Sequence, residues 1–319
     1  MSTTQQQLPM ILDEIEVVSV ERLSPSFVRF ELGGDALAEL GVDGPFYDQR
    51  IKLIFPNDGG RLPSFADADD SWWTTWLEIP ESERGHMRTY TIREVRGEGV
   101  DTRMVVDIVL HLADEETGAG SAWAAQAAVG DRLVVIAPRK GAAYGGIEFD
   151  PGTASELLLV GDETAVPAVC SILEDLHPHA RGVAFLEVPE SADAEALRDQ
   201  AAPAGVRVVW LPRDGAALGS LLEAEVRRHL AVEEVPVEPV PADEVDPDLW
   251  ETPHYSSSGE SVDEPVASVG HDLDGVYAWI AGESVVVTGL RRLLVRELGM
   301  DRRQVAFMGY WRRGVSMRS

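Results

Sequence analysis

The spacing of apolar residues in the first half of the chain is typical of short antiparallel strands. Six β-rich runs, mostly bounded by Gly, Pro, Asp or Ser, lie at residues 12–20, 26–32, 49–55, 87–95, 103–111 and 132–137. One Ala-rich helix is expected at roughly 119–128. Six strands with one helix predict a closed antiparallel β-barrel. Residues 56–86 predict a long loop whose three tryptophans either plug the barrel end or serve the function.

Apolar residues in the second half of the chain follow a different spacing. Continuous apolar runs lie at 157–160, 183–188, 206–211, 276–280 and 305–308, and helical segments near 165–176, 191–201, 216–230 and 284–298 separate them. Apolar strands that alternate with helices predict a parallel sheet buried on both faces. The domain boundary is expected near Asp150-Pro151-Gly152.

An acidic insertion interrupts this α/β pattern at residues 231–272. It contains repeated Val-Pro and Glu-Pro steps, and no Lys or Arg occurs between His229 and Ala281. This composition predicts a disordered or weakly ordered loop. The expected organisation is a flexible N-terminus (1–11), a barrel domain (12–150) and an α/β domain (153–319) that carries the insertion.

The net charge, the apolar runs and the cysteine count of the chain limit its binding partners and its location in the cell. The chain has 319 residues and a formal net charge of −28, which argues against nucleic acid and anionic lipid surfaces. No apolar run approaches the ~20 residues of a membrane span, and the N-terminus has no basic start followed by an apolar core. Cys170 is alone, so no disulfide framework is expected. These observations predict a cytoplasmic protein.

Three segments in the first half have the properties needed to bind a flavin dinucleotide. Arg88-Thr89-Tyr90-Thr91 places a cation, an aromatic ring and a hydroxyl on one strand, with Arg88 and Tyr90 on the same face. Residues 107–111 predict a second strand, and Gly120-Ser121-Ala122-Trp123-Ala124 predicts a helix start. A ring can lie against the isoalloxazine, and backbone amides at a helix start can bind a pyrophosphate.

A fourth segment predicts a nucleotide site in the second half. Residues 161–167, Gly-Asp-Glu-Thr-Ala-Val-Pro, follow the first parallel strand and open a helix, with Asp162 as a candidate helix cap. Nucleotides bind at this edge of such sheets, although the segment is not a G-x-G-x-x-G motif. Arg213, after the third strand, is either a contact for a cofactor 2′-phosphate or a solvent-facing turn residue.

These segments, together with residues 130–131, 137–141, 279–283 and 309–314, resemble the siderophore-interacting, or ferric-siderophore reductase, flavoproteins of the ferredoxin-reductase superfamily. The resemblance runs from about residue 12 to the C-terminus and excludes about 231–272. It implies a six-stranded FAD-binding barrel followed by an NAD(P)H-binding domain. Residues 112–118 depart from the short Gly-Pro-Ala-Ser turn of the family, so their contacts stay open.

The resemblance also implies roles for individual residues. Tyr90 would stack on the isoalloxazine, Arg88 would reach the pyrophosphate and Thr91 would bond near the ring. On the FAD side it implies contacts from the strand residues Asp107, Val109 and His111, of which Val109 and His111 would act through their backbone amides. It also implies that Ser121 is an N-cap donor and that Trp123 lies beside the adenine. On the nucleotide side it implies Thr164 and Glu283 near the nicotinamide and the terminal aromatics Tyr310 and Trp311 over the flavin.

The activity implied by the resemblance is transfer of electrons from NAD(P)H through FAD to an Fe(III)-siderophore. No metal-ligand, catalytic-triad or paired-carboxylate pattern is apparent, which fits chemistry supplied by a flavin. An anionic ferric complex requires local cations, and the candidates are Lys52, Lys140 and Arg312. Two alternatives stay open: a flavoprotein of the same fold that takes electrons from ferredoxin or reduces another acceptor, and a non-catalytic flavin-binding interaction protein with the insertion as its docking arm. Two lysines in total and only eight residues after Trp311 favour NAD(P)H over ferredoxin. The siderophore, the choice of NADH or NADPH, and the oligomeric state stay undetermined.

Overall fold

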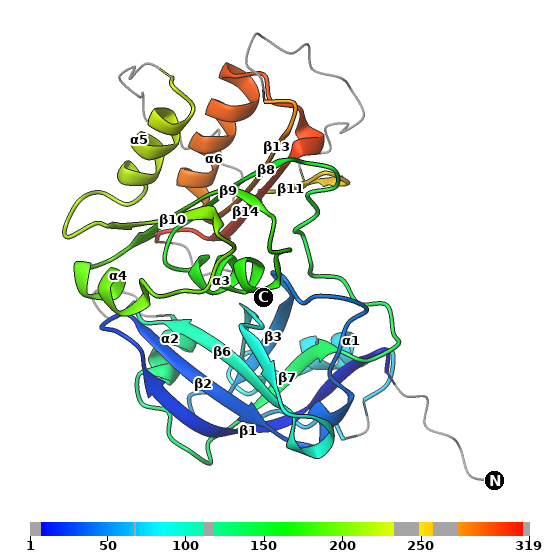
Figure 1. Ribbon diagram of the computed structural model, residues 1–319. Helices are drawn as coiled ribbons and strands as arrows, with labels where there is room; N and C mark the ends of the chain where they lie inside the picture. Colours follow the sequence, from blue (N-terminus) through cyan, green and yellow to red (C-terminus); the bar gives the residue numbers. More distant parts are fainter. Residues whose placement is uncertain (1–7, 67, 112–117, 233–248, 258–272, 315–319) are drawn as a thin grey trace. The chain divides into compact units, whose positions relative to one another are not determined.

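The computed structural model describes residues 8–66, 68–111, 118–232, 249–257 and 273–314. The chain forms two compact units (Figure 1). The first contains the described residues up to Leu23 and Phe27–Ile147, and the second contains Ser24–Ser26 and the residues from Glu148 onward.

The first unit is built on one antiparallel sheet of seven strands in the order β4-β3-β7-β1-β2-β6-β5. The prediction of six strands was wrong because the run 87–95 is interrupted at Ile92 and Arg93. Its two pieces bond to opposite edges of the curled sheet, β4 to β3 and β5 to β6. The strands are β1 (Met10–Arg22), β2 (Phe27–Gly33), β3 (Arg50–Phe55), β4 (His86–Thr91), β5 (Glu94–Arg96), β6 (Arg103–Val109) and β7 (Arg132–Pro138).

Both faces of this sheet are buried near β3 and β7. Ile51, Leu53 and Phe55 of β3 belong to the main core of the unit. On the other face, Ile54 packs with Trp76 of helix α1 (Trp72–Glu78). The prediction of a structureless loop over 56–86 was therefore wrong in its middle, where Trp76 is 1% exposed. The remaining helical elements are η1 (Asp35–Glu39), η2 (Gly99–Asp101) and α2 (Ala119–Ala124).

The second unit is a doubly wound sheet. Strands β10, β9, β8, β13 and β14 lie in that order and pair in parallel, as predicted. Helices α5 and α6 cover one face and α3 and α4 lie on the other (Figure 1). The elements are β8 (Glu156–Gly161), α3 (Val166–Asp175), β9 (Arg181–Val188), α4 (Ser191–Leu197), β10 (Gly205–Pro212), α5 (Ser220–His229), β13 (Val276–Glu283), α6 (Ser284–Arg291), the π-helical segment η4 (Arg292–Glu297), η5 (Arg302–Gln304) and β14 (Val305–Trp311).

A short hairpin makes this sheet mixed rather than wholly parallel. Strands β11 (Trp250–Thr252) and β12 (Tyr255–Ser256) come from the predicted insertion, and β11 pairs antiparallel with β14. Glu251 is 4% exposed and forms a two-point ion pair with Arg291 of α6. The expectation of disorder across 231–272 was therefore wrong for residues 249–257. Residues 233–248 and 258–272 lie outside the described part of the chain.

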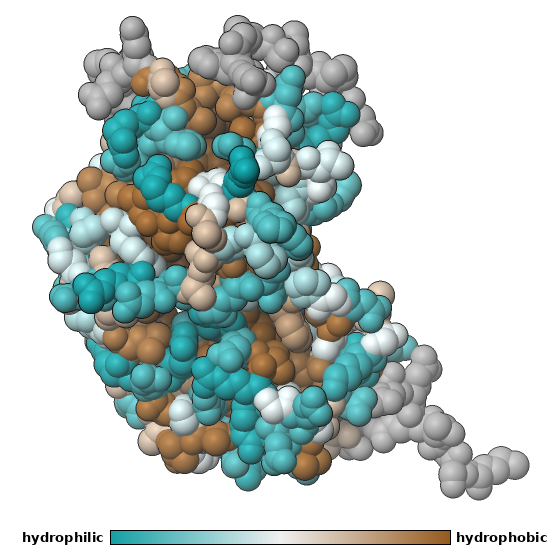
Figure 2. All heavy atoms as spheres, in the orientation of Figure 1, coloured by the Kyte–Doolittle hydropathy of each residue, from teal (hydrophilic) through white to brown (hydrophobic). Residues whose placement is uncertain are grey.

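In the described residues, the structure contains no helix that is both long enough and apolar enough to cross a bilayer. On the face shown in Figure 2, hydrophilic residues cover much of the surface and hydrophobic patches lie between them.

Candidate functional site

Arg88 and Tyr90 occupy one face of β4, as the strand alternation predicted. Their partners across the β3–β4 ladder are Leu53 and Ile51, which belong to the core of the first unit. The Tyr90 ring packs edge-on against Phe55, with centroids 5.9 Å apart at 84°. Burial raises the pKa of the Tyr90 hydroxyl, so it stays protonated at any physiological pH. The Arg88 guanidinium donates to the carbonyl of Met87 at 2.7 Å.

Gly120 is the closest neighbour of the Tyr90 hydroxyl in helix α2. A Cβ at position 120 would lie 2.1 Å from that hydroxyl oxygen and 3.2 Å from a ring carbon of Phe55. No side chain fits there, so glycine allows the helix start and the Tyr90 ring to meet. Trp123, one turn later, packs on Phe55 with centroids 5.0 Å apart. Tyr90, Phe55 and Trp123 therefore form one aromatic cluster.

The predicted N-cap role of Ser121 was wrong. The N-cap position of α2 is Gly118, and Ser121 lies inside the helix. Its hydroxyl accepts a hydrogen bond from the backbone N–H of His111 at 2.9 Å. The His111 amide, expected to face a pyrophosphate, thus anchors the end of the preceding strand to α2. Within the segment 112–118, which departs from the family's short turn, residues 112–117 lie outside the described part of the chain.

The carboxylate of Asp107 is used inside the fold. It accepts two hydrogen bonds at 2.7 Å from the guanidinium of Arg29 and lies 3.8 Å from the guanidinium of Arg93. Asp107 is 7% exposed. Its neighbour Val109 pairs with Phe27 on β2, and Thr91 is buried on the face of β4 opposite Tyr90. The structure therefore places Arg88 and Tyr90 together and assigns the Asp107 side chain a structural partner.

The three candidate substrate cations do not form one cluster in the first unit. The Lys52 ammonium donates to the Thr89 hydroxyl at 2.7 Å, on the face of β3 and β4 opposite Tyr90. Burial and the nearby Arg50 lower the pKa of Lys52. Lys140 is exposed and donates to the carbonyl of Ala38 at 3.0 Å. Arg312, in the second unit, is half-buried immediately after β14.

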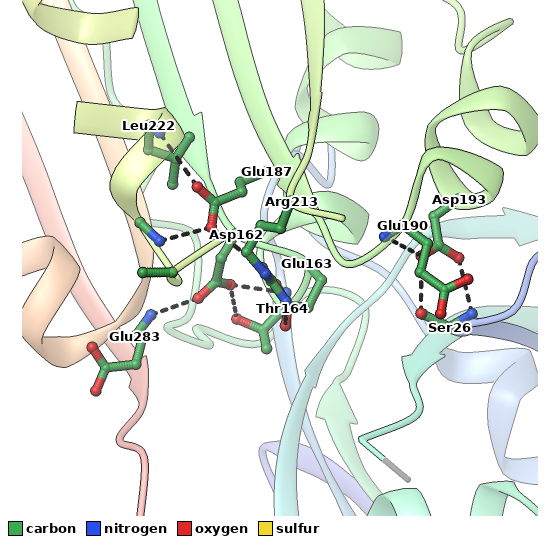
Figure 3. A network of polar contacts seen from close by, with 12 residues as sticks. Ser26, Asp162, Glu163, Thr164, Glu187, Glu190, Asp193, Arg213, Leu222 and Glu283 are labelled. Carbon is green, nitrogen blue, oxygen red and sulfur yellow. Dashed lines mark hydrogen bonds and ion pairs between the residues drawn. The ribbon is translucent and has the colours of Figure 1, made fainter. Parts of the chain in front are cut away.

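Asp162 is the hub of polar contacts in the second unit. It follows β8 at the point where the strand order reverses between β8 and β13, which is where open α/β sheets bind ligands. One carboxylate oxygen accepts from the Thr164 N–H at 2.9 Å and the Thr164 hydroxyl at 2.6 Å. The other accepts from the Glu283 N–H at 2.7 Å and the Trp311 indole N–H at 2.9 Å. Figure 3 shows Asp162 between Thr164 and Glu283.

The environment of Asp162 shifts its titration. Burial and the neighbouring Glu163 carboxylate raise the pKa of Asp162 to about 7, against the hydrogen bonds from Thr164, Trp311 and Glu283. The predicted role of Asp162 as a helix cap was wrong, because the N-cap of α3 is Ala165. Asp162 instead connects the β8–α3 loop to the ends of β13 and β14.

Glu283 and the terminal aromatics are also fixed by contacts within the second unit. Glu283 is the N-cap of α6, and its carboxylate accepts from the N–H groups of Val285 at 2.7 Å and Val286 at 3.2 Å. The Tyr310 ring stacks on Trp250 of the hairpin, with centroids 6.1 Å apart at 18°. Trp311 is held by Asp162. Thr164, Glu283 and Trp311 therefore meet through one carboxylate.

Arg213 is engaged by two buried carboxylates. Its guanidinium makes a two-point pair with Glu163, at 2.6 and 2.9 Å, and lies 3.3 Å from Glu187 (Figure 3). Burial alone would lower the pKa of Arg213, but Glu163 and Glu187 outweigh it and raise that pKa. Glu187 also accepts from the N–H groups of Gly219 and Leu222 at the start of α5. Arg213 is thus not a solvent-facing turn residue, because its guanidinium is 14% exposed and paired with carboxylates of the second unit.

Sequence reasoning missed the contributions of Gly120, Glu163 and Glu187. The sequence indicates where each of these residues lies but not what it contacts. Gly120 lies at a helix start, Glu163 comes shortly after an apolar strand, and Glu187 is near the end of another. Charged residues at the carboxyl ends of buried strands are candidates for internal pairing or for ligands, and the sequence does not distinguish the two.

A pocket of about 430 Å³ lies at the other end of strands β8, β9 and β10. It is lined by Glu156, Arg181, Gly182, Val183, Gly205, Arg207 and His229. None of the residues predicted for the site lines it. Among the residues that the structure describes, no group of three or more His, Cys, Asp or Glu side chains is placed to hold a metal ion.

Comparison with known families accounts for both units. The siderophore-interacting FAD-binding domain matches residues 16–142, and the siderophore-interacting protein model matches residues 154–314. The chain belongs to the siderophore-interacting protein family. This confirms the resemblance drawn from the motifs, across the first unit and the second.

Known members and solved structures align with nearly the whole chain. Ferric vibriobactin reductase ViuB of Vibrio cholerae is 27% identical over 309 residues, which cover 96% of this chain and 90% of that protein. An NADPH-dependent ferric-chelate reductase of Escherichia coli is 27% identical over 307 residues, which cover 93% and 92% of the two chains. The crystal structure of a siderophore utilization protein from T. fusca matches with a TM-score of 0.66 and 30% identity over 98% of this chain and 97% of that chain.

A more distant structure confirms the fold class alone. The ferredoxin reductase in carbazole 1,9a-dioxygenase matches with a TM-score of 0.54 and 17% identity, covering 95% of this chain and 70% of that chain. An antiparallel β-domain followed by an α/β domain is therefore the ferredoxin-reductase-like arrangement that the sequence predicted.

Proposed function

We propose that this protein is an FAD-dependent reductase that transfers electrons from NAD(P)H to Fe(III)-siderophores and so releases iron as Fe(II). One observation carries the proposal: a single chain joins a siderophore-interacting FAD-binding domain to a doubly wound sheet whose reversal point is lined by the 161–167 loop. When bound, FAD supplies the chemistry that converts the hydride of a nicotinamide into single electrons for iron.

The first unit fits the flavin through its own side chains. The close approach of Gly120 fixes the Tyr90 ring, because a Cβ at position 120 would occupy the place of the hydroxyl. Tyr90 is partly exposed and offers a ring to stack against an isoalloxazine, and Arg88 on the same face offers a cation to a pyrophosphate. The proposed roles of Val109 and Trp123 support the same dinucleotide from the neighbouring strand and helix.

The second unit fits a nicotinamide nucleotide at the carboxyl ends of β8 and β13. Asp162 fixes the Thr164 hydroxyl and the Trp311 indole through its two oxygens. Glu283 is the N-cap of α6, and its capping hydrogen bonds hold its backbone in place at the same edge of the sheet. These residues position a nucleotide and exclude water from it. No side chain is required to transfer a proton.

Recognition of the ferric complex rests on local positive charge. In a chain with net charge −28, an anionic siderophore is attracted only where cations outweigh the acids within about 8–10 Å. We assign this role to Lys52, Lys140 and Arg312. We also propose a cytoplasmic site of action, which agrees with Cys170 being the single cysteine of the sequence.

Anaerobic stopped-flow spectroscopy of the FAD-loaded protein tests the proposal. NADH or NADPH should bleach the flavin absorbance, and a ferric siderophore should restore it while an Fe(II) chelator reports released iron. Reduction by ferredoxin but by neither nucleotide would assign a different electron donor. A reduced flavin that ferric siderophores fail to reoxidise would assign a different acceptor.

A further inference from the structure

The ends of strands β9 and β10 carry an arginine that is not available to a phosphate. In doubly wound folds, an acidic residue after the second strand bonds the 2′-hydroxyl of the adenosine ribose, whereas an arginine nearby accommodates the 2′-phosphate of NADP. Arg213 follows β10 and is the cation in the two segments 187–193 and 211–215, which also contain Glu187, Glu190, Asp193 and Asp214. Its contacts therefore decide which nucleotide this edge of the sheet accepts.

We propose that this protein uses NADH in preference to NADPH, because Glu163 and Glu187 pair with Arg213 and the exposed carboxylates of Glu190 and Asp214 lie in the same two segments. The inference rests on the proposed function, in which a nicotinamide nucleotide is the electron donor. Glu163 is 2% exposed and Glu187 is 0% exposed. To reach a 2′-phosphate, Arg213 would leave both buried carboxylates without their cation, and breaking a buried ion pair is strongly unfavourable.

The neighbouring surface adds negative charge. Glu190 is exposed and caps helix α4, and Asp214 is exposed after β10. Asp214 accepts hydrogen bonds from the N–H and hydroxyl of Ser191, which lower the pKa of Asp214 and keep it ionised. The Ser191 hydroxyl, a potential donor to phosphate, is therefore directed to a carboxylate.

The exposed carboxylates should interact differently with the ribose 2′ substituents of NADH and NADPH. A ribose 2′-hydroxyl can donate a hydrogen bond to an exposed carboxylate such as Glu190 or Asp214. A 2′-phosphate carries close to two negative charges and cannot donate, so the same carboxylates repel it. Because both are at the surface, salt should weaken this repulsion over a Debye length of about 8 Å at physiological ionic strength.

Two measurements on the FAD-loaded protein test the inference. In the first, kcat/KM for flavin reduction should be about tenfold or more higher with NADH than with NADPH at low salt, and the ratio should fall as salt rises. In the second, calorimetry should show that 5′-AMP binds about tenfold more tightly than adenosine 2′,5′-bisphosphate, which differs from it only by the 2′-phosphate. The second measurement does not depend on electron transfer.

Matched variants locate the effect. Glu190→Gln with Asp214→Asn keeps the acceptor oxygens that cap α4 and bind Ser191 but removes two charges. The double variant should narrow the NADH-to-NADPH ratio several-fold, whereas Glu195→Gln, an exposed acid further along α4, should leave the ratio unchanged. An equal effect from Glu195→Gln would overturn the assignment to Glu190 and Asp214.

The outcomes separate this inference from the proposed function. NADPH that is as efficient as NADH, or bisphosphate that binds as tightly as 5′-AMP, overturns the preference and leaves the reductase function intact. Binding of neither adenosine fragment overturns the nucleotide subsite at this edge. Flavin that ferredoxin reduces but neither nucleotide reduces overturns both the preference and the proposed electron donor.

Discussion

Replacing Gly120 with alanine should displace Tyr90 and weaken FAD binding. The new Cβ would lie 2.1 Å from the Tyr90 hydroxyl oxygen and 3.3 Å from the ring carbon that carries it, so one of the two groups must move. Overpacking of this kind costs about 1–3 kcal/mol, whereas glycine-to-alanine in a helix gains about 1 kcal/mol. The free energy of unfolding should therefore fall by at most about 2 kcal/mol.

The effect on FAD binding is measured separately from the effect on folding. An aromatic stacking contact contributes about 0.5–1.5 kcal/mol, so its loss corresponds to roughly a threefold to tenfold rise in the FAD dissociation constant. Flavin fluorescence titration of the apoprotein measures this constant, and thermal unfolding reports stability separately. Gly118→Ala is the matched control, because a Cβ at position 118 meets nothing within 4 Å.

The Tyr90→Phe variant tests whether the clash involves the Tyr90 hydroxyl. In Tyr90→Phe the hydroxyl is gone, and the nearest remaining Tyr90 atom would lie 3.3 Å from the Cβ at position 120. The Gly120→Ala change should then cost little further FAD affinity. If Gly120→Ala binds FAD as tightly as Gly118→Ala, or if Tyr90→Phe gives no relief, the clash with Tyr90 does not control the flavin site.

Three further predictions concern the other parts of the molecule. Glu251→Ala should lower the free energy of unfolding by about 3–5 kcal/mol in urea denaturation, because it removes the buried carboxylate that makes a two-point ion pair with Arg291. A change within 0.5 kcal/mol would show that the hairpin is not part of the second core. The pKa of Asp162 lies at about 7, above its usual 3.8, so the folded state binds the extra proton and its stability should fall as pH rises from about 4 to 7, by up to about 4 kcal/mol. Asp162→Asn should remove that part of the slope, and parallel slopes for the two proteins would contradict the assignment. Charge reversal at Arg312 or Lys140 should raise the half-saturating concentration of an anionic ferric siderophore in a salt-dependent way without changing the rate of flavin reduction. Lys52→Glu should raise that concentration least, because Lys52 lies on the face of β3 and β4 opposite Tyr90. Equal kinetics for all three variants and the parent protein would show that these cations are not part of the substrate site.

The sequence predicted most strands because their side-chain pattern is local. The five parallel strands are continuous apolar runs, and each was predicted to within three residues of its observed bounds. The strands of the curled antiparallel sheet alternate or carry apolar residues on both faces, as for Ile51 and Ile54 in β3. The break at Ile92 and Arg93 was not predictable, because a strand that leaves one edge of a curled sheet for the other keeps its β-rich composition throughout.

Elements that depend on distant partners were missed. Helix α1 has only seven residues within a stretch rich in Pro, Asp and Gly, and it is stabilised by the burial of Trp76 against Ile54 and Met87. The β11–β12 hairpin lies within an acidic, proline-rich insertion. Trp250 reaches Tyr310, and Glu251 reaches Arg291, so the partners that order the hairpin lie at least 40 residues further along the chain.

The site residues show why a motif predicts a residue's place better than its role. Asp107 was selected through the family resemblance and Arg213 because an arginine after the third strand can bind a cofactor phosphate, but either charge serves an internal partner equally well. Arg29 reaches Asp107 from 78 positions away, and Glu163 reaches Arg213 from 50. Arg88 and Tyr90 differ because their face of β4 is partly exposed and their neighbours include a glycine that admits the Tyr90 ring. Exposure and close packing therefore favour Arg88 and Tyr90 as the residues that hold the flavin, and they place Asp107 and Arg213 among those that hold the fold.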